Sequence, residues 1–210
     1  RTSSRKMKTN VVYTCVTGNY DRLKSPRVVD PEWDYICFTN NKNITSDVWD
    51  VRYINDDSLS DVKLARKVKI LYHQYVGEYD RVLWIDANYI LFSTPQAFID
   101  ATNPNNLPLS LSVHEFRDCV YEEMMACQSF GKDASGRMEA QITRYRSEGL
   151  PEHVGMVETG LMYRRKDTVT AQIMEEWWDE VMNWSHRDQL SFNYVTWKHP
   201  DFLYNTFAQN

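Results

Sequence analysis

The chain has 210 residues, a formal net charge of −5, and ordinary shares of hydrophobic (42%) and charged (25%) residues. This length suits one domain with a sizeable core, and the composition excludes a disordered tail, a collagen and a coiled coil. The negative charge argues against a non-specific nucleic-acid binder, which usually has a basic face. No apolar run approaches the roughly 18 residues that a membrane-spanning helix needs.

The first half of the chain alternates short apolar runs with amphipathic stretches. The run Asn10–Val16 is β-branched and aromatic and ends at the turn sequence TGNYD, as a buried strand does. In Asp61–Tyr75, apolar residues recur at helical spacing. The elements predicted for this half are strands over Asn10–Val16, Asp34–Phe38, Trp49–Ile54 and Arg81–Asp86, and helices over Asp61–Tyr75 and Pro95–Ala101.

The second half has longer helical patterns. The strongest is Thr168–Trp184, whose apolar residues share one face. A turn at Gly160 is expected to interrupt one strand, and the tail from His199 to Asn210 has no pattern. The elements predicted here are strands over Leu109–His114 and Met156–Arg164, and helices over Tyr121–Phe130, Arg137–Glu148, Thr168–Trp184 and Asp188–Trp197.

The order of these elements predicts an α/β fold. Strand–helix alternation implies a mostly parallel central sheet with helices on both faces. No repeat or Gly/Pro/Ser-rich linker divides residues 10–210, so we expect one domain there. Residues 1–9 are polar and basic and lack the apolar segment of a signal peptide. We interpret them as a linker or tail from a longer, multidomain chain, or as a weak membrane-surface patch.

The cysteines bear on the cellular compartment. Cys15, Cys37, Cys119 and Cys127 show no CxxC spacing, which argues against a zinc ribbon and a thioredoxin-like site. We expect four free, reduced thiols. Reduced thiols suit the cytoplasm, so the predicted location is cytoplasmic, with peripheral contact at a membrane as the variant.

The clearest chemical signal is the segment Trp84–Asn88. Strand Arg81–Asp86 ends on a carboxylate, and ligands of open parallel sheets bind beyond the carboxyl ends of the strands. Asn88 adds a second oxygen two residues later. Two hard oxygens at this spacing suit Mg²⁺ or Mn²⁺ bridging a diphosphate. The alternative is that Asp86 caps the next turn and Asn88 only serves the loop.

A second polar cluster follows the strand that ends at His114. If a helix begins early, one of its faces would carry a histidine, an arginine, a tyrosine and two carboxylates. Such a row can bind sugar hydroxyls, or it can be a solvated salt-bridge face. The five residues are His114, Arg117, Asp118, Tyr121 and Glu122.

Six motifs support a resemblance to a known family. They are TGxYD (Thr17–Asp21), DYxCFTN (Asp34–Asn40), ARxxKI (Ala65–Ile70), LWIDxN (Leu83–Asn88), HxxRDxxYxE (His114–Glu123) and RDQxSF (Arg187–Phe192). Together they span roughly residues 11–197. On these motifs the chain resembles a poorly characterised family of glycosyltransferase-like domains of the A-type fold. That family is itself similar to glycogenin-like retaining glycosyltransferases, whose turn and helix start resemble Glu158–Met162 and Asp188–Asn193.

The resemblance implies a Rossmann-like sheet, a nucleotide-binding half over about residues 10–105 and an acceptor half over about 106–200. It also implies roles for single residues. Donor-binding residues would be Thr17, Gly18, Asn19, Tyr20, Asp21, Arg66, Lys69, Asp86, Ala87 and Asn88. Acceptor-binding residues would be His114, Arg117, Asp118, Tyr121, Glu122, Thr159, Gly160 and Arg187. Asp188, Glu158 and Gln189 would be catalytic, and Asp86, Asn88 and His199 would hold Mn²⁺ or Mg²⁺.

The activity that this implies is metal-dependent transfer of a sugar from a nucleoside diphosphate sugar, with UDP favoured, to a glycan hydroxyl in polysaccharide synthesis. The glycogenin-like features favour a retaining hexosyltransferase. Two departures stand out, because Asn88 replaces a second carboxylate and His199 lacks the motif that surrounds the family's histidine ligand. The alternative is a nucleotide- or carbohydrate-binding module without turnover. A Rossmann oxidoreductase is disfavoured, since no GxGxxG follows the first strand.

Overall fold

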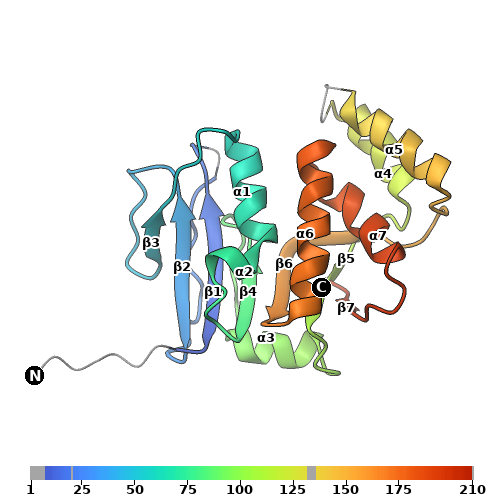
Figure 1. Ribbon diagram of the computed structural model, residues 1–210. Coiled ribbons are helices and arrows are strands. Elements are labelled where there is room, and N and C mark those ends of the chain that lie inside the picture. Colours follow the sequence, from blue (N-terminus) through green and yellow to red (C-terminus); the bar gives the residue numbers. More distant parts are fainter. Residues whose placement is uncertain (1–7, 20, 132–135, 210) are drawn as a thin grey trace, which may run out of the picture.

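A computed structural model describes residues 8–19, 21–131 and 136–209. Its centre is a seven-stranded sheet in the order β3-β2-β1-β4-β6-β5-β7 (Figure 1). The strands are β1 (Asn10–Val16), β2 (Trp33–Thr39), β3 (Asp50–Tyr53), β4 (Arg81–Ile85), β5 (Leu109–Val113), β6 (Val157–Arg165) and β7 (Asn205–Phe207). The helices are α1 (Asp61–Ile70), α2 (Tyr72–Tyr75), α3 (Pro95–Thr102), α4 (Val120–Ser129), α5 (Arg137–Glu148), α6 (Thr168–Asn183) and α7 (Gln189–Trp197).

The sheet confirms the predicted α/β class and refines it. Strands β3, β2, β1 and β4 pair in parallel, and so do β5 and β7. Strand β6 runs antiparallel to both of its neighbours, β4 and β5. This one reversed strand brings its first residues to the edge where β4 and β5 end.

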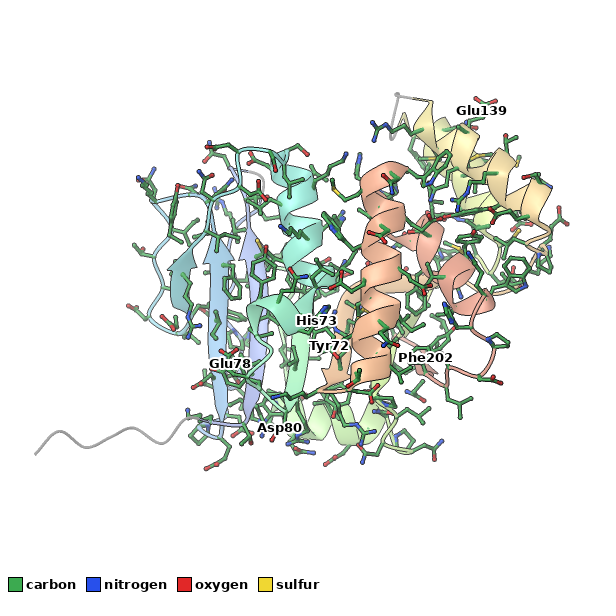
Figure 2. The ribbon with its side chains drawn as sticks, in the orientation of Figure 1. Tyr72, His73, Glu78, Asp80, Glu139 and Phe202 are labelled. Carbon is green, nitrogen blue, oxygen red and sulfur yellow. The ribbon has the colours of Figure 1, made fainter. Side chains whose placement is uncertain are left out.

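Two apolar cores lie against the sheet. One collects β-strand side chains with residues of α1, α4, α5, α6 and α7, including the fully buried Trp177. The other packs Ile99 of α3 and the aromatic residues Trp33, Tyr35 and Trp49 against the strands. Both faces are therefore covered, one mainly by helices and the other by α3 and long connecting segments. The side chains of Tyr72 and His73, which belong to α2, lie between that helix and α6 (Figure 2). His73 Nε2 is 2.7 Å from Oε1 of Glu175 on α6.

The helix predicted over Asp61–Tyr75 is broken at Leu71, which has φ −85° and ψ 55°. Buried side chains explain the break. Arg164 donates to the carbonyls of Lys69 (2.7 Å) and Ile70 (2.8 Å), and Tyr13 Oη donates to the Lys69 carbonyl at 2.8 Å. Because these side chains satisfy the last carbonyls of α1, the helix can end without a continuing i→i+4 ladder.

Two other predictions need correction. Strand β6 runs through Gly160 without the expected turn, since Leu161 and Met162 continue the ladder with β4. The tail contains a strand, β7, which pairs with β5. Its three residues are too few to show a period in the sequence.

The four cysteines are free, as predicted, and all four are buried. Over the described ranges, none of the helices combines the length and apolar character that crossing a bilayer requires.

Candidate active site

The centre of the candidate site is the buried ammonium of Lys69, on the last turn of α1. Its Nζ lies 2.9 Å from Asp188 Oδ2 and 3.7 Å from Asp86 Oδ1. It also donates to Thr159 Oγ1 at 2.6 Å. Residues expected to serve the donor, the acceptor and catalysis therefore converge on one amine.

The topology explains this convergence. Asp86 follows β4, Thr159 lies near the start of the reversed strand β6, and Asp188 immediately precedes α7. The backbone N–H of Asp86 donates to the carbonyl of Gly160 at 2.9 Å, which joins the two strand ends. The buried indole of Trp177 donates to the carbonyl of Asp188 at 2.9 Å and fixes the start of α7.

Asp188 is a buried carboxylate held in its charged form. Burial alone would raise its pKa, but the charges of Lys69 and Arg66 and the hydrogen bonds from Lys69 and Thr159 hold the pKa well below its usual range. Arg66 Nε is 3.7 Å from Asp188 Oδ2. Asp188 is therefore ionised at neutral pH and is a weak proton acceptor.

The loop after β1 lies at the same sheet edge. Thr17 Oγ1 donates to the carbonyl of Asp61, and the N–H of Gly18 donates to Asn40 Oδ1, both at 2.8 Å. Gly18 has a φ of +58°, and a Cβ there would lie 2.6 Å from Asp61 Oδ2. The left-handed backbone conformation therefore favours glycine at this position, and the carboxylate of Asp61 lies close against it.

Asn40, Asn41 and Asp61 were missed by the sequence analysis. Asn41 Nδ2 donates to Gly18 O at 3.1 Å and to Asn19 Oδ1 at 3.2 Å, and Asn40 Nδ2 donates to Asp61 Oδ1 at 2.8 Å. Asn40 closes the DYxCFTN motif, which was the available signal. Of the other loop residues predicted to bind the donor, Asp21 is exposed and Tyr20 lies outside the described residues.

Gly160 and Glu158 border the centre on the β6 side. A Cβ on Gly160 would lie 2.6 Å from the ring of Tyr89, so that ring rests directly on the glycine. Glu158 is half-buried, and its Oε1 lies 3.5 Å from the backbone N–H of Glu115. Ala87 is buried, and Gln189 is the half-buried first residue of α7.

The predicted helical row from His114 to Glu122 is wrong as geometry, because α4 begins only at Val120. A loop brings His114 and Arg117 to Glu123 instead. Arg117 Nε is 2.5 Å and His114 Nε2 is 3.4 Å from Glu123 Oε2, and Arg187 Nη2 is 4.0 Å from Oε1. Glu123, rather than Glu122, is the buried carboxylate, and it closes the HxxRDxxYxE motif.

Three other predicted acceptor residues lie apart from this group. Tyr121 is buried and donates to the carbonyl of Leu150 at 2.5 Å, which is a structural role. Asp118 and Glu122 are exposed and meet His153, with Asp118 Oδ1 2.6 Å from His153 Nδ1. Among the described residues, this trio is the one group of His, Cys, Asp or Glu whose ligand atoms all lie within 4.8 Å of one another.

Asp86 and Asn88 fit a cation that takes its other ligands from phosphate and water. Asp86 Oδ1 accepts from the indole of Trp84 at 2.9 Å. In the part of the chain that the structure describes, no hydrogen bond reaches Asp86 Oδ2 or the exposed side chain of Asn88. One carboxylate oxygen and one amide oxygen match Mg²⁺ or Mn²⁺, which often bind one or two protein oxygens together with substrate phosphates.

His199 does not belong to this set. It follows the C-terminal end of α7, whereas Asp188 precedes the N-terminal end, and nine helical residues span roughly 13 Å. Its Nε2 lies 2.6 Å from Glu176 Oε2. We therefore withdraw His199 as a metal ligand.

The charges around the centre suit an anionic group. Lys69 and Arg66 supply two positive charges beside Asp86 and Asp188, and Arg187 and Arg117 follow on the α4 side. With a divalent cation at Asp86 the balance becomes positive, which matches a diphosphate.

Comparison with known proteins finds relatives of the chain and its family. Among curated proteins, the probable hexosyltransferase MUCI70 of Arabidopsis thaliana is 26% identical over 214 aligned positions, which cover 88% of this chain and 36% of that protein. The chain thus spans little more than a third of the length of this relative.

Two solved structures are distantly similar. A glycosyltransferase involved in glycosylation of the major capsid of PBCV-1 has 12% identity and a TM-score of 0.39, covering 76% of this chain and 66% of that one. Mouse xyloside xylosyltransferase 1, in its apo form, has 11% identity and a TM-score of 0.49, covering 96% and 85%.

A family model described as TOD1/MUCI70, glycosyltransferase-like domain, matches residues 1–209. The match includes both strand ends that carry the site and the loop that holds Glu123. The chain therefore belongs to the TOD1/MUCI70 family of glycosyltransferase-like domains.

Proposed function

We propose that this domain transfers a hexose from a nucleoside diphosphate sugar, with UDP as the favoured nucleotide, to a hydroxyl of a glycan in polysaccharide synthesis. The observation that carries the proposal is the buried Lys69, which joins Asp86 from the first half to Asp188 from the second. Family membership supports the transferase class.

Asp86 and Asn88 would hold Mn²⁺ or Mg²⁺. When bound, such an ion supplies Lewis-acid stabilisation of the charge that develops on the leaving diphosphate. Lys69 and Arg66 add fixed positive charge on the same side. The loop Thr17–Asn19 would lie against the nucleotide, since it is fixed at the same sheet edge by Asn40 and Asn41.

The state of Asp188 favours retention. A general base works best with a pKa near the working pH, whereas the pKa of Asp188 is held well below its usual range by its cationic neighbours. Asp188 instead suits stabilisation of positive charge on the sugar carbon. The bond from that carbon to the phosphate oxygen breaks, the bond to the acceptor oxygen forms, and the acceptor proton passes to the leaving phosphate. In an inverting reaction, Glu158 would be the better base.

One observation favours a second candidate, a binding module without turnover. Lys69 Nζ lies 3.7 Å from the single carboxylate of the proposed metal site, and a positive charge there opposes cation binding. Such a module would bind a nucleoside diphosphate through Lys69 and Arg66, and the metal would add nothing.

The test combines binding and turnover. Wild type and Asp86→Ala are titrated with UDP and GDP, with and without Mn²⁺, and release of nucleoside diphosphate is followed across a panel of sugar nucleotides. We expect Mn²⁺ to tighten binding in wild type only, and turnover to need Asp86. Asn88→Asp should bind Mn²⁺ equally well or more tightly, because a carboxylate is the stronger hard ligand. Binding that ignores Mn²⁺, without turnover, would favour the module.

We also propose a cellular location for the protein. A cytoplasmic site, with peripheral membrane contact as the variant, is supported by four buried free thiols. Fractionation of cells that make the full-length protein, followed by protease protection, tests it.

A further inference from the structure

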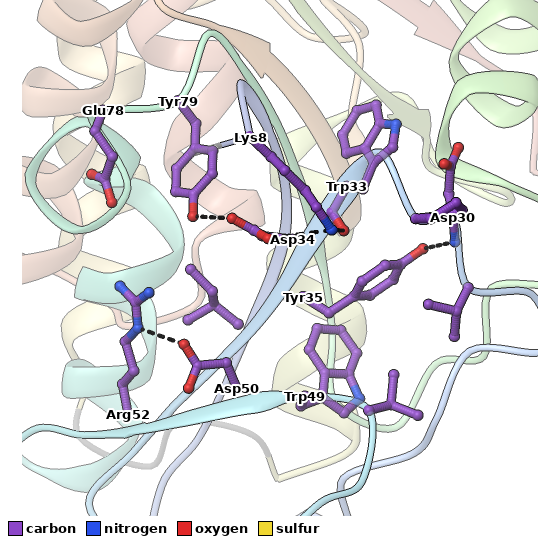
Figure 3. Close-up of a pocket in the computed structure, with 14 residues that line it drawn as sticks. Lys8, Asp30, Trp33, Asp34, Tyr35, Trp49, Asp50, Arg52, Glu78 and Tyr79 are labelled. Carbon is purple, nitrogen blue, oxygen red and sulfur yellow. Dashed lines mark hydrogen bonds and ion pairs between the residues drawn. The ribbon is translucent and has the colours of Figure 1, made fainter. Parts of the chain in front are cut away.

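A cavity of about 620 Å³ lies away from the candidate active site (Figure 3). It is lined where β2 and β3 begin and by Glu78 and Tyr79, which precede β4. Asp86 follows the other end of β4, and five strand residues span roughly 16 Å. The cavity and the candidate active site therefore lie at opposite ends of the strands of the same sheet.

The cavity exists because the outer strand starts late. Strand β1 pairs with β2 from Trp33 onward, whereas β3 joins β2 only at Ile36, opposite Asp50. The preceding segment turns away from the sheet, and the indole of Trp49 is fixed there by a hydrogen bond to the carbonyl of Lys24 at 3.0 Å. The first residues of β2 consequently form one wall of an open wedge.

Internal contacts make the walls of this wedge rigid. Tyr79 Oη donates to Asp34 Oδ2 at 2.7 Å, and Lys8 Nζ lies 3.7 Å from Asp34 Oδ1. The ring of Tyr35 meets that of Trp49 edge to face, with centroids 5.7 Å apart. Figure 3 shows Tyr35 and Trp49 next to each other on one side and the Asp34–Tyr79 pair on the other. A preformed cavity loses little free energy to reorganisation when a ligand binds.

The charges of the lining disfavour an anionic ligand. Four carboxylates line the cavity against two cations, Lys8 and Arg52; the carboxylates are Asp30, Asp34, Asp50 and Glu78. They do not form a metal site either, because among the described residues only Asp118, Glu122 and His153 bring three such ligand atoms within 4.8 Å of one another. Asp50 and Arg52 are already paired, at 3.1 Å.

The lining offers what an uncharged polyhydroxyl ligand needs. Carboxylate oxygens accept hydrogen bonds and the Lys8 and Arg52 side chains donate them, while each hydroxyl of a sugar does both. Val29, Pro31 and Val48 give an apolar side for the C–H face of a sugar ring. The volume falls in the range of about 300–1,000 Å³ that is usual for ligand sites.

We propose that this cavity, lined by Trp33–Ile36, Val48–Asp50 and Tyr79, is a second, non-catalytic binding site for an uncharged oligosaccharide. The inference rests on the proposed function only in that both concern glycans, because binding here needs neither the donor nor turnover. A long glycan acceptor bound in this cavity would have a higher effective concentration at the candidate active site, at the other end of the strands.

The test is residue-resolved binding. The ¹⁵N-labelled chain is titrated with four neutral hexasaccharides (cellohexaose, xylohexaose, mannohexaose and β-1,4-galactohexaose), and with trigalacturonic acid and tetralysine as charged probes. We expect at least one neutral hexasaccharide to shift the amide signals of Trp33–Ile36 and Val48–Asp50, with both charged probes at least tenfold weaker there. Shifts confined to residues around Asp86 and Asp188 would overturn the second site, as would tighter binding of a charged probe.

Variants separate this site from the active site. Val29→Trp places a bulky ring on the rim, and the pair Asp50→Asn with Arg52→Gln weakens polar contacts at exposed positions. Each should weaken oligosaccharide binding about tenfold and leave UDP binding unchanged.

The matched controls Val169→Trp and Glu139→Gln should stay within twofold of wild type. Asp86→Ala should keep the oligosaccharide affinity, so failure of the proposed transferase and failure of this site are distinguishable. Equal losses in controls and cavity variants would refute the site.

Discussion

Trp84 lies two residues before Asp86 on the same face of the sheet, and its indole N–H fixes one oxygen of that carboxylate at 2.9 Å. Its ring also lies near Lys69, whose Nζ is 5.9 Å from the ring centroid. Trp84 thus restrains the carboxylate so that only Oδ2 is open to a cation. Such outer contacts commonly change metal affinity by about 10- to 100-fold.

We therefore predict that Trp84→Phe, which keeps a ring and loses the donor, weakens Mn²⁺ binding about tenfold in the presence of UDP. Calorimetric titration measures it. Trp178→Phe, a buried tryptophan on α6, is the control and should leave the affinity unchanged. Equal affinity in wild type and Trp84→Phe would show that the indole has no such role.

Asp188 gives a prediction about pH. Its pKa in the folded chain lies well below the roughly 3.9 of an unfolded aspartate, so ionised Asp188 stabilises the fold above about pH 4. That stability is lost as the pH falls through the folded pKa. The difference in unfolding free energy between wild type and Asp188→Asn should be constant at neutral pH and shrink below about pH 4. Urea unfolding at a series of pH values tests this, and a difference that does not change with pH would contradict it.

At the scale of elements, the sequence predicts those features that depend on local pattern. Strand β4 could be expected to end on Asp86, because an apolar run stops there, and the carboxyl edge then followed from strand direction. Glu158 and Thr159 lie beside the carboxyl end of β4 because β6 is antiparallel to β4. No local pattern in the sequence shows that direction.

The remaining differences have long-range causes. The break at Leu71 follows from a buried arginine more than ninety residues away. The assignment of Glu122 instead of Glu123 came from assuming a helix that already begins at His114, whereas α4 begins only at Val120 and the residues before it form a loop. His199 was chosen for its place after the DQ segment, but the length of α7 carries it away.

The loop after β5 and the start of α4 give a prediction at the same scale. Glu123 joins this loop to Arg187, the residue before Asp188. Glu123→Gln leaves the partly buried guanidinium groups of Arg117 and Arg187 without their charge partner and should lower the free energy of unfolding by roughly 1–3 kcal/mol. Urea denaturation measures this change.

The neighbouring residue is the matched control. Glu122 is exposed, so Glu122→Gln should change the free energy of unfolding by no more than about 0.5 kcal/mol. If both variants lose equal stability, or neither does, Glu123 does not join these segments in solution.

For the whole molecule, the thiols are the simplest check of packing. Burial raises the pKa of Cys37 to about 12, and burial also raises that of Cys15. Since the thiolate is the reactive form, the native chain should react slowly with Ellman's reagent at pH 8. In denaturant without reductant it should show four thiols. Fewer than four would mean that a disulfide forms in solution, contrary to the free cysteines of the structure.

Arg164 has a consequence for how members of this family can be recombined. Its guanidinium, carried by β6, serves as the terminal cap of α1 and also bonds Tyr13 of β1 at 3.0 Å. A chimera joined near residue 105 would take Lys69 from one parent and the cap that positions it from another. Exchange of acceptor preference between relatives should therefore succeed only when α1 and β6 come from the same parent. By the same argument, the preference for a donor and the preference for an acceptor would be inherited together.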